Sequence, residues 1–179
     1  MHYKKLKIEM TEMAGVRSSL RAMRFPKDNS KGDSTFCLNV VTIGKKDKAL
    51  AKRLIKAGNE HAKFVRGIDV WIELYFQAGF MIELETYRIG IDTLSTSSSM
   101  HNELKNLIGV ELAEQKQKDL STKVYHRISK VSYQTLRKMY KERRNHKHPD
   151  WQIFCDFIET LPFFDIFIYP EFINTKDWS

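Results

Sequence analysis

The most regular pattern in the chain is an alternation of apolar and polar residues over residues 68–76. The apolar side chains at every second position are Ile68, Val70, Ile72, Leu74 and Phe76. A strand that turns one face toward a core produces this period of two. We therefore predict a strand over residues 68–76.

Apolar residues spaced three or four positions apart predict helices in several other segments. Four of these segments are 14–24, 77–87, 101–120 and about 130–144. Another begins near Asp47, which can cap it, and ends at Gly58, and the last lies between Pro149 and Pro162. Proline is favoured in the first turn of a helix but cannot continue a helix at a later position. Pro149 therefore suits the beginning of the last predicted helix, and Pro162 suits its end. Residues 26–34 are rich in turn formers and predict a loop, and residues 89–99, with an Ile-Gly-Ile-Asp stretch and a Ser/Thr run, predict a turn or a short strand.

The order of these elements predicts the fold class. Helices surround one clear strand, and neither an internal repeat nor a linker divides the sequence. The length of 179 residues also lies within the roughly 100–200 residues of an ordinary domain. We predict a single α/β (α+β) domain over residues 1–179, in which long helices flank a small sheet.

Composition excludes several classes of protein. Apolar residues make up 42% of the chain, enough for a core, yet no run approaches the ~18 apolar residues that span a bilayer. The first residues carry charge with no apolar block after them, so we expect no secretory signal. Two cysteines, Cys37 and Cys155, cannot build a disulfide framework, and we expect a cytoplasmic location.

The basic excess is concentrated in one segment. Residues 116–149 carry eleven Lys and Arg against two acidic residues, a local charge of +9 within a net charge of +8. Residues 150–179 carry six acidic residues against one lysine, a local charge of −5. One interpretation is a solvated helix packed beside an acidic tail. The other is an anion site built on that helix, with a small anionic partner rather than a long polyanion.

Common phosphate and metal motifs are missing from the sequence. The eight glycines are never closer than nine positions apart, which excludes a P-loop and a dinucleotide fingerprint. His146, His148 and Cys155 lack a fourth ligand at zinc-like spacing, so we predict no metal site. The serines within 95–99 lack the small-residue elbow of a nucleophile; they predict a polar turn and leave phosphate binding open.

The segment 143–151 has the components of an anion site. Arg143 and Arg144 can bind phosphate or a pyrimidine edge through paired donors. A helix that begins at Pro149 adds free backbone N–H groups. Alternatively, the two arginines pair with acidic residues that follow, which are Asp150, Asp156 and Glu159. Trp151 continues an apolar stripe of the last helix, which favours a core position over a stacking platform.

Three blocks of the sequence resemble the flavin-dependent thymidylate synthases. Residues 54–64 resemble the family's helix end followed by a Gly-His-Glu-x-x-Phe-like turn. Residues 77–88 end in Thr-Tyr-Arg, where the family has an Arg-His-Arg flavin motif. Residues 131–153, with Arg143, Arg144 and a Trp-Gln-Ile triplet, resemble the family's late helix and its Trp-Glu-Ile helix. The pattern around residues 85–101 is also similar to small phage-encoded relatives of the synthase.

The resemblance implies a fold like that of the thymidylate synthase-complementing proteins and a homotetramer with FAD at its subunit interfaces. It implies reductive one-carbon transfer that converts dUMP to dTMP in nucleotide biosynthesis, with NADPH and methylene-tetrahydrofolate. The nucleotide-binding residues that it implies are Arg88, Arg143 and Arg144, to which we add Ser97 and Ser99 of the serine run that replaces a family motif; the cofactor-binding residues are Tyr87, Arg88 and His148. The helix phase favours Arg143 as the arginine that contacts the base, whereas the spacing to Trp151 favours Arg144. No catalytic residue can be named.

The chain also departs from the family pattern. Thr86 and Tyr87 replace the first two residues of the flavin triplet, and residues 91–99 lack the acid and the second arginine of the family's Ser-x-Asn-Glu-x-Ser-x-Arg motif. Three hypotheses follow: an enzyme of the synthase type, a catalytically silent protein that binds or sequesters a nucleotide, and a nucleic-acid-binding protein. The third is the least favoured, because acidic residues directly follow the basic segment.

Overall fold

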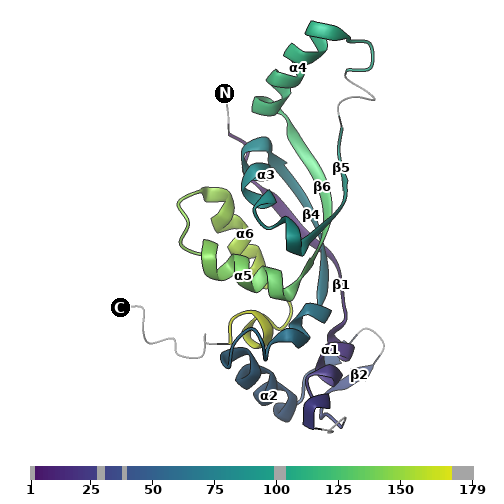
Figure 1. The fold of residues 1–179 in the computed structure, drawn as a ribbon, viewed down its shortest axis with the longest axis vertical. Helices are drawn as coiled ribbons and strands as arrows, with labels where there is room; N and C mark the ends of the chain where they lie inside the picture. The colour runs from purple at the N-terminus through teal and green to yellow at the C-terminus, as the bar shows by residue number, and fades with distance from the viewer. Residues whose placement is uncertain (1–2, 28–30, 38–39, 99–103, 171–179) are drawn as a thin grey trace.

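A four-stranded antiparallel sheet forms the centre of the structure (Figure 1), a computed structural model that describes residues 3–27, 31–37, 40–98 and 104–170. The strands, in the order β1-β4-β6-β5, are β1 (Lys7–Ala14), β4 (Asp69–Gln77), β6 (Val124–Ser132) and β5 (Ile91–Thr96). A separate two-stranded sheet pairs β2 (Thr35–Cys37) with β3 (Val40–Thr42). An antiparallel sheet with helices packed against it confirms the predicted α+β class.

Strand β4 confirms the prediction for residues 68–76 and explains its strict alternation. Val70, Ile72, Leu74 and Phe76 are fully buried, whereas the residues between them are only half-buried on the opposite face. β1 and β6 pair with β4 on its two sides. An interior strand with one face in the core has to place apolar residues at every second position.

The pattern of the sequence predicts none of the strands β1, β2, β3 and β6 and leaves β5 undecided. β1 is an edge strand with mostly exposed residues, and its register shifts between Met10 and Glu12. The register shift interrupts the alternation of the side chains between the two faces of β1. Because most of these side chains are also exposed, β1 has no regular pattern of apolar residues. β5, the other edge, extends to Thr96 and resolves the alternative of turn or short strand in favour of a strand.

The helix predicted at about 130–144 is wrong at its beginning. Val131 lies in β6, opposite Val70 of β4. The helix α5 (Tyr133–Arg143) begins only after Ser132, whose hydroxyl accepts a hydrogen bond from the backbone N–H of Thr135 and caps the helix. The strand runs directly into the helix without a turn residue between them, so no local signal marks the boundary.

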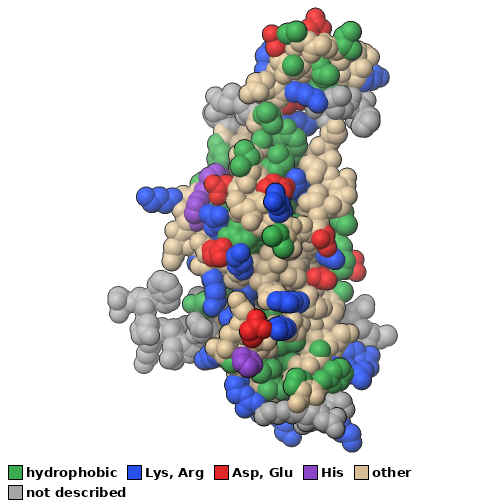
Figure 2. Space-filling model, in the orientation of Figure 1, with side chains coloured by type: hydrophobic (Ala, Val, Ile, Leu, Met, Phe, Trp, Pro, Cys, Tyr) green, Lys and Arg blue, Asp and Glu red, His purple; other side chains and the backbone are tan. Residues whose placement is uncertain are grey.

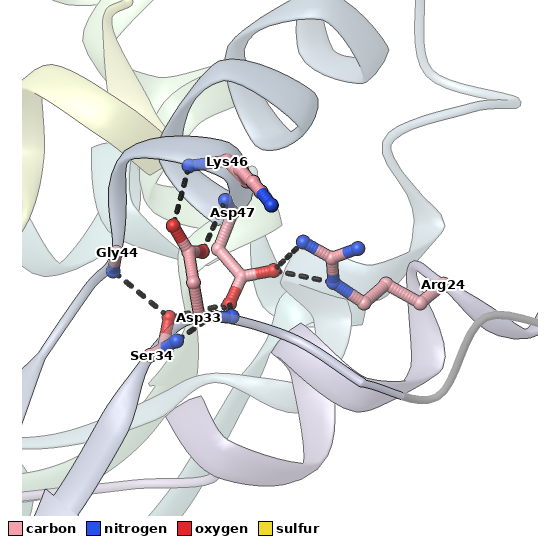
Figure 3. A network of polar contacts seen from close by, with 6 residues as sticks. All are labelled: Arg24, Asp33, Ser34, Gly44, Lys46 and Asp47. Atoms are coloured by element: carbon pink, nitrogen blue, oxygen red, sulfur yellow. Dashed lines mark hydrogen bonds and ion pairs between the residues drawn. The ribbon is translucent and has the colours of Figure 1, made fainter.

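The helix α2 (Lys45–Lys56) ends as predicted but is capped by a different residue (Figure 3). Asp47 is not its N-cap: it lies in the first turn, and its buried carboxylate pairs with Arg24. The carboxylate of Asp33 instead accepts hydrogen bonds from the backbone N–H groups of Lys46 (2.8 Å) and Asp47 (2.9 Å). The cap therefore comes from the preceding loop rather than from the sequence next to the helix.

The other helices follow the predicted order with shifted ends. They are α1 (Val16–Ala22), α3 (Ala78–Glu85), α4 (Gly109–Thr122) and α6 (Pro149–Thr160), and short helical turns are η1 (Phe25–Lys27), η2 (Lys63–Gly67), η3 (Arg88–Gly90) and η4 (Phe164–Ile168). The prediction of a helix over 101–120 is wrong for residues 104–108, and residues 101–103 lie outside the described part of the chain. α6 has Pro149 in its first turn and ends before Pro162, as predicted.

The core lies between one face of the sheet and the helices α3, α5 and α6, whereas α4 is carried away from it at the ends of β5 and β6 (Figure 1). Its largest fully buried side chains include Trp151, Tyr133, Phe76, Phe80, Phe154 and Phe167. The core position predicted for Trp151 is thus confirmed. Within the described residues, no helix combines the length and the apolarity that a membrane span requires.

Candidate functional site

A basic cavity of about 760 Å³ lies between α5, the segment 59–66 and the turn that follows α3. Four of the described residues that line it are cations, namely Arg66, Arg137, Lys138 and Lys141. Neutral hydrogen-bonding side chains of the lining include Asn59, Thr86, Gln134 and Thr135. A volume of this size is in the range of small-molecule pockets.

The charge of the basic cavity is one-sided. Glu142 is the acidic residue among its described lining, and its carboxylate already accepts a hydrogen bond from the hydroxyl of Tyr87 (2.7 Å). Lys138 and Lys141 are exposed at the surface of α5. Cations gathered in a concave surface raise the local concentration of anions. On the face shown in Figure 2, Lys and Arg side chains recur over the middle of the molecule, where α3 and α5 lie.

Helix α5 positions most of these side chains. Gln134, Lys138 and Lys141 recur at intervals of four and three residues, so they project from one face of the helix. Arg137 is buried behind them and donates a hydrogen bond to the carbonyl oxygen of Ile55 at the end of α2 (3.4 Å). From the opposite wall, the guanidinium of Arg66 donates to the side-chain oxygen of Gln134. The wall that carries Arg66 is thereby tied to α5.

Gly90 allows the turn after α3 to approach α5 closely. A Cβ atom at this position would lie 2.1 Å from the hydroxyl oxygen of Thr135 and 2.9 Å from its Cβ. The second contact involves an atom that cannot rotate away, so any larger residue would push the turn and the helix apart. The glycine therefore sets the width of the basic cavity at this wall.

Tyr87 and Arg143, two residues of the predicted site, are brought together behind this wall. The Tyr87 hydroxyl donates to Glu142 and accepts from Nε of Arg143 (2.9 Å). Burial raises the pKa of Tyr87, as does the bond to Glu142, while Arg143 lowers it. The Arg143 guanidinium also lies 4.9 Å from the ring centre of Trp151 and 3.6 Å from the carboxylate of Glu83. Arg143 is thus held by neighbours on several sides and positions Tyr87.

Arg144 lies on another side of α5. Its guanidinium pairs with Asp156 (2.7 Å) and with Glu159 (3.2 Å) of α6. This is the alternative considered for the arginine pair, in which acidic residues further along the chain neutralise it. For Arg143 the acidic partner is Glu83 of α3 instead. The two arginines therefore have different contacts: Arg143 with Tyr87 and Glu83 of the α3 side, and Arg144 with Asp156 and Glu159 of α6.

The remaining predicted site residues are distributed over three places. Arg88 is exposed and lies between the lining residues Tyr87 and Ile89. Ser97 follows β5, and its hydroxyl accepts a hydrogen bond from the backbone N–H of His126 (2.9 Å). His148 is the N-cap of α6, where its Nδ1 accepts from the N–H of Asp150 (3.2 Å). Ser99 lies outside the described residues.

The histidines and the cysteine near α6 have structural partners. His146 Nδ1 accepts a hydrogen bond from the backbone N–H of His148 (3.1 Å), and Cys155 is fully buried. Burial raises the pKa of the Cys155 thiol to about 12, so it stays protonated. Metal ions bind the thiolate rather than the thiol. Among the described residues, no group of three or more His, Cys, Asp and Glu side chains is placed to hold a metal ion.

Four cations of the basic cavity, Arg66, Arg137, Lys138 and Lys141, are not among the site residues that the sequence predicts. The last three lie in the basic segment 116–149, for which the sequence leaves open a solvated helix or an anion site built on the helix, but their spacing does not show which of them line a cavity. Arg66 could not have been found from spacing, because it reaches Gln134 from a segment 68 residues earlier. A site assembled across that distance requires the tertiary structure.

Comparisons with known proteins agree with the fold. No family model matches the chain, and no curated protein sequence matches it. A solved structure of the flavin-dependent thymidylate synthase ThyX from Helicobacter pylori, complexed with FAD and dUMP, is similar with a TM-score of 0.64. The two chains are 15% identical, and the similarity covers 91% of this chain and 97% of that one. This chain has the ThyX fold.

A second ThyX structure from the same organism, also with FAD and dUMP, gives the same result at 14% identity and a TM-score of 0.61. It covers 92% of this chain and 97% of that chain. The predicted resemblance in fold is therefore confirmed. At this identity the ThyX fold describes the path of the chain, and function has to be argued from the side chains.

Proposed function

We propose that this chain binds a small anionic nucleotide of the pyrimidine deoxynucleotide class, such as dUMP, in the basic cavity. The observation that carries the proposal is the imbalance of charge among the described lining residues, where Arg66, Arg137, Lys138 and Lys141 stand against the acidic residue Glu142. Glu142 is itself engaged by Tyr87, Arg137 by the carbonyl oxygen of Ile55 and Arg66 by Gln134, so the proposal rests mainly on the exposed Lys138 and Lys141. The two similar ThyX structures contain FAD and dUMP, which agrees with this ligand class.

The lining offers separate partners for the two parts of a nucleotide. Lys138 and Lys141 project from α5 and can bind phosphate oxygens through charge-assisted hydrogen bonds. Gln134, whose oxygen already accepts from Arg66, offers its amide NH₂, and Thr135 offers a hydroxyl; these groups can recognise the edge of a base or a sugar. Arg88, exposed at the rim, would add a second phosphate contact.

The roles of the other predicted residues follow from their contacts. Arg143 would act as a positioning residue, because it holds Tyr87 through the hydroxyl and the ring. Arg144, Ser97 and His148 are not among the described residues that line the basic cavity, and the proposed site does not use them.

The lining fits the anionic part of FAD better than its ring system. Arg66, Lys138 and Lys141 suit a diphosphate, whereas Tyr87 is the aromatic residue among the described lining. The cationic group of Lys138 lies 5.7 Å from the centre of that ring and that of Arg143 lies 5.5 Å from it. If FAD bound here in place of dUMP, it would supply hydride chemistry, and Arg66, Lys138 and Lys141 would hold its phosphates.

Calorimetry on the full chain tests the nucleotide site. We expect saturable binding of dUMP that weakens as salt is added, and much weaker binding of deoxyuridine, which lacks the phosphate. Titration with FAD, followed by absorbance, tests the cofactor separately. The absence of binding by dUMP and by any other nucleotide would remove the proposal.

A second candidate is a catalytically silent nucleotide binder on the ThyX fold, of the kind that small phage-encoded relatives could provide. The observation that favours it is the engagement of both arginines near position 143, one by Glu83 and Tyr87 and the other by Asp156 and Glu159. An assay with dUMP, FAD, NADPH and methylene-tetrahydrofolate separates the candidates. Formation of dTMP supports the enzyme, and tight binding without turnover supports the silent protein.

We also propose that the chain forms a homo-oligomer, with the tetramer that the resemblance implies as the expected state. Large apolar side chains are strongly exposed on several elements; they include Ile82 (70%), Ile89 (98%), Leu94 (60%), Ile108 (81%) and Val110 (72%). Ile89 also lines the basic cavity, so a second copy that covers it would enclose the site. Light scattering after size exclusion would give the mass directly, and a monomer at all concentrations would contradict this part.

A further inference from the structure

A second cavity, of about 780 Å³, lies on the other side of the segment 58–67, between α2 and the end of α1. We call it the apolar cavity because Met23, Leu50, Leu54 and Phe64 form much of its described lining. Met23 and Phe64 belong to the core, and the two leucines are half-buried at its edge. At the end of the molecule where α1 and α2 lie, Figure 2 shows hydrophobic side chains with Lys and Arg side chains around them.

Four cations surround the apolar lining, and two of them are already neutralised. Arg24 pairs with the buried carboxylate of Asp47. Lys63 pairs with Glu60, the acidic residue of the described lining (2.6 Å). These two ion pairs leave little net charge for a ligand at their side of the cavity.

The other two cations, Lys46 and Arg53, have no ion pair with any acidic side chain in the described part of the chain. Both project from the same face of α2, seven residues apart, which corresponds to about 10 Å along the helix. Leu50 and Leu54 stand on that face as well, beside the two cations. The helix thus offers a positive group at each end of an apolar stretch.

We propose that the apolar cavity binds a carboxylate with an apolar body, of the size of a medium-chain fatty acid. The body would displace water from the leucines, Met23 and Phe64, which provides the driving force. Its carboxylate would bind the guanidinium of Arg53 through two parallel hydrogen bonds. A nucleotide fits this lining less well, because Met23, Leu50, Leu54 and Phe64 have no donor or acceptor for a base, and His61 is the uncharged hydrogen-bonding side chain of the described lining.

The site does not depend on the function proposed for the basic cavity. Glu60, Lys63 and Phe64 line the apolar cavity, whereas Asn59 and Arg66 of the same segment line the basic one. Either cavity can therefore be tested while the other stays intact.

The test is a calorimetric titration of the full chain with decanoate below its micelle concentration, compared with decanol as the uncharged probe. We expect one saturable site for decanoate and affinity at least about tenfold lower for decanol. Arg53→Gln should lower the decanoate affinity by about the same factor. Lys56→Gln is the matched control, because Lys56 is an exposed cation of the same helix outside the described lining; it should change nothing.

A second variant tests the apolar part. Ala22 is exposed at the end of α1 and lines the cavity, so Ala22→Phe would fill it without disturbing the core. Loss of decanoate binding in this variant, with an unchanged circular dichroism spectrum, supports the proposal. The absence of a saturable site in the wild-type chain overturns it. So does equal binding by the wild type, Arg53→Gln and Ala22→Phe.

Discussion

Arg66 and Lys63 stand three positions apart on one short segment, yet they line cavities of different character. Around Arg66 the cations outnumber the acids, and hydroxyl and amide groups lie among them. Around Lys63 the floor is apolar, and two of the four cations are held in ion pairs with Asp47 and Glu60. The contrast teaches that the net charge of the chain says little about a site until the internal pairing of each charge is known. It also predicts that changes at one cavity leave the other unaffected.

The largest effect is expected for Asp47→Asn, beside the apolar cavity. The change leaves Arg24, which is 9% exposed, without its buried partner, and breaking such a pair costs about 3–5 kcal/mol. Urea unfolding measures the loss. Lys48→Ala, next to it on α2, removes an exposed ion pair with Asp165 and should cost less than about 1 kcal/mol. Similar losses in the two variants would show that the Arg24–Asp47 pair is no more important than a surface contact.

The next effect concerns the ligand of the basic cavity. Lys141→Ala should weaken dUMP binding by about 1.5–3 kcal/mol, because it removes a charged donor to the phosphate. Isothermal titration gives the value. Arg53→Gln removes a cation from the apolar cavity and should leave dUMP affinity as it is. If both variants lose affinity equally, the anion responds to the general charge of the surface and not to this cavity.

Gly90→Ala tests the wall of the basic cavity. The added Cβ would meet Thr135 at 2.1 Å, and overpacking of this kind costs about 1–3 kcal/mol. Gly79→Ala is the control: its Cβ would meet nothing within 4 Å, and alanine in a helix adds up to about 1 kcal/mol of stability. Thermal unfolding of both variants should give shifts of opposite sign. A stabilised Gly90→Ala variant would mean that the wall is looser than described.

A smaller effect on stability is expected from Tyr87 at high pH. Burial and the bond to Glu142 raise the pKa of Tyr87 above its ordinary value of 10, so the folded chain holds the phenol proton more tightly than the unfolded chain. The stability from this difference is present below pH 10 and is lost as the pH rises above it. Tyr87→Phe should flatten the fall of stability above pH 10. Tyr133 and Tyr140, whose pKa burial also raises, contribute to the fall in both proteins, so the comparison uses the difference between the two curves. Identical curves of stability against pH for the wild type and Tyr87→Phe would show that Tyr87 does not cause the loss of stability above pH 10.

The smallest effect is expected for Arg144→Ala. Its ion pairs with Asp156 and Glu159 are partly exposed, and such pairs contribute about 1 kcal/mol or less to stability. Affinity for dUMP should not change, because Arg144 is not part of the described lining of the basic cavity. A large loss of nucleotide affinity in this variant alone would move the site to the junction of α5 and α6.

The elements that the sequence revealed are those whose pattern is set by local burial. The alternation of β4 and the apolar stripe of α6 follow from one face in the core, so both were predictable. β1 and β6 lacked a clear signal, since β1 is an exposed edge and β6 continues directly into α5. The cap of α2 by Asp33 and the bond between Arg66 and Gln134 are contacts across the fold, which spacing along the chain does not encode.

For the candidate site, the sequence located the basic segment but not the side of the helix that faces a cavity. Arg143 and Arg144 are adjacent, yet one turns to Tyr87 and the other to α6. Helix phase could separate them only if the neighbouring elements were known. Which cations line the cavity therefore depends on how α3, η2 and α5 pack against one another. That packing is determined by the whole core.

The cap that Asp33 provides to α2 has a consequence for how the chain tolerates changes in length. The residues that join the cap to the helix, including β2 and β3, must return to the same point in space for the carboxylate to meet the N–H groups of Lys46 and Asp47. Inserting or deleting residues between them would alter the pairing of the small sheet and, at the same time, expose the first turn of α2. The described residues of this stretch are exposed or half-buried, and at such positions loops usually vary most freely. Its length is nevertheless fixed by the helix that it starts.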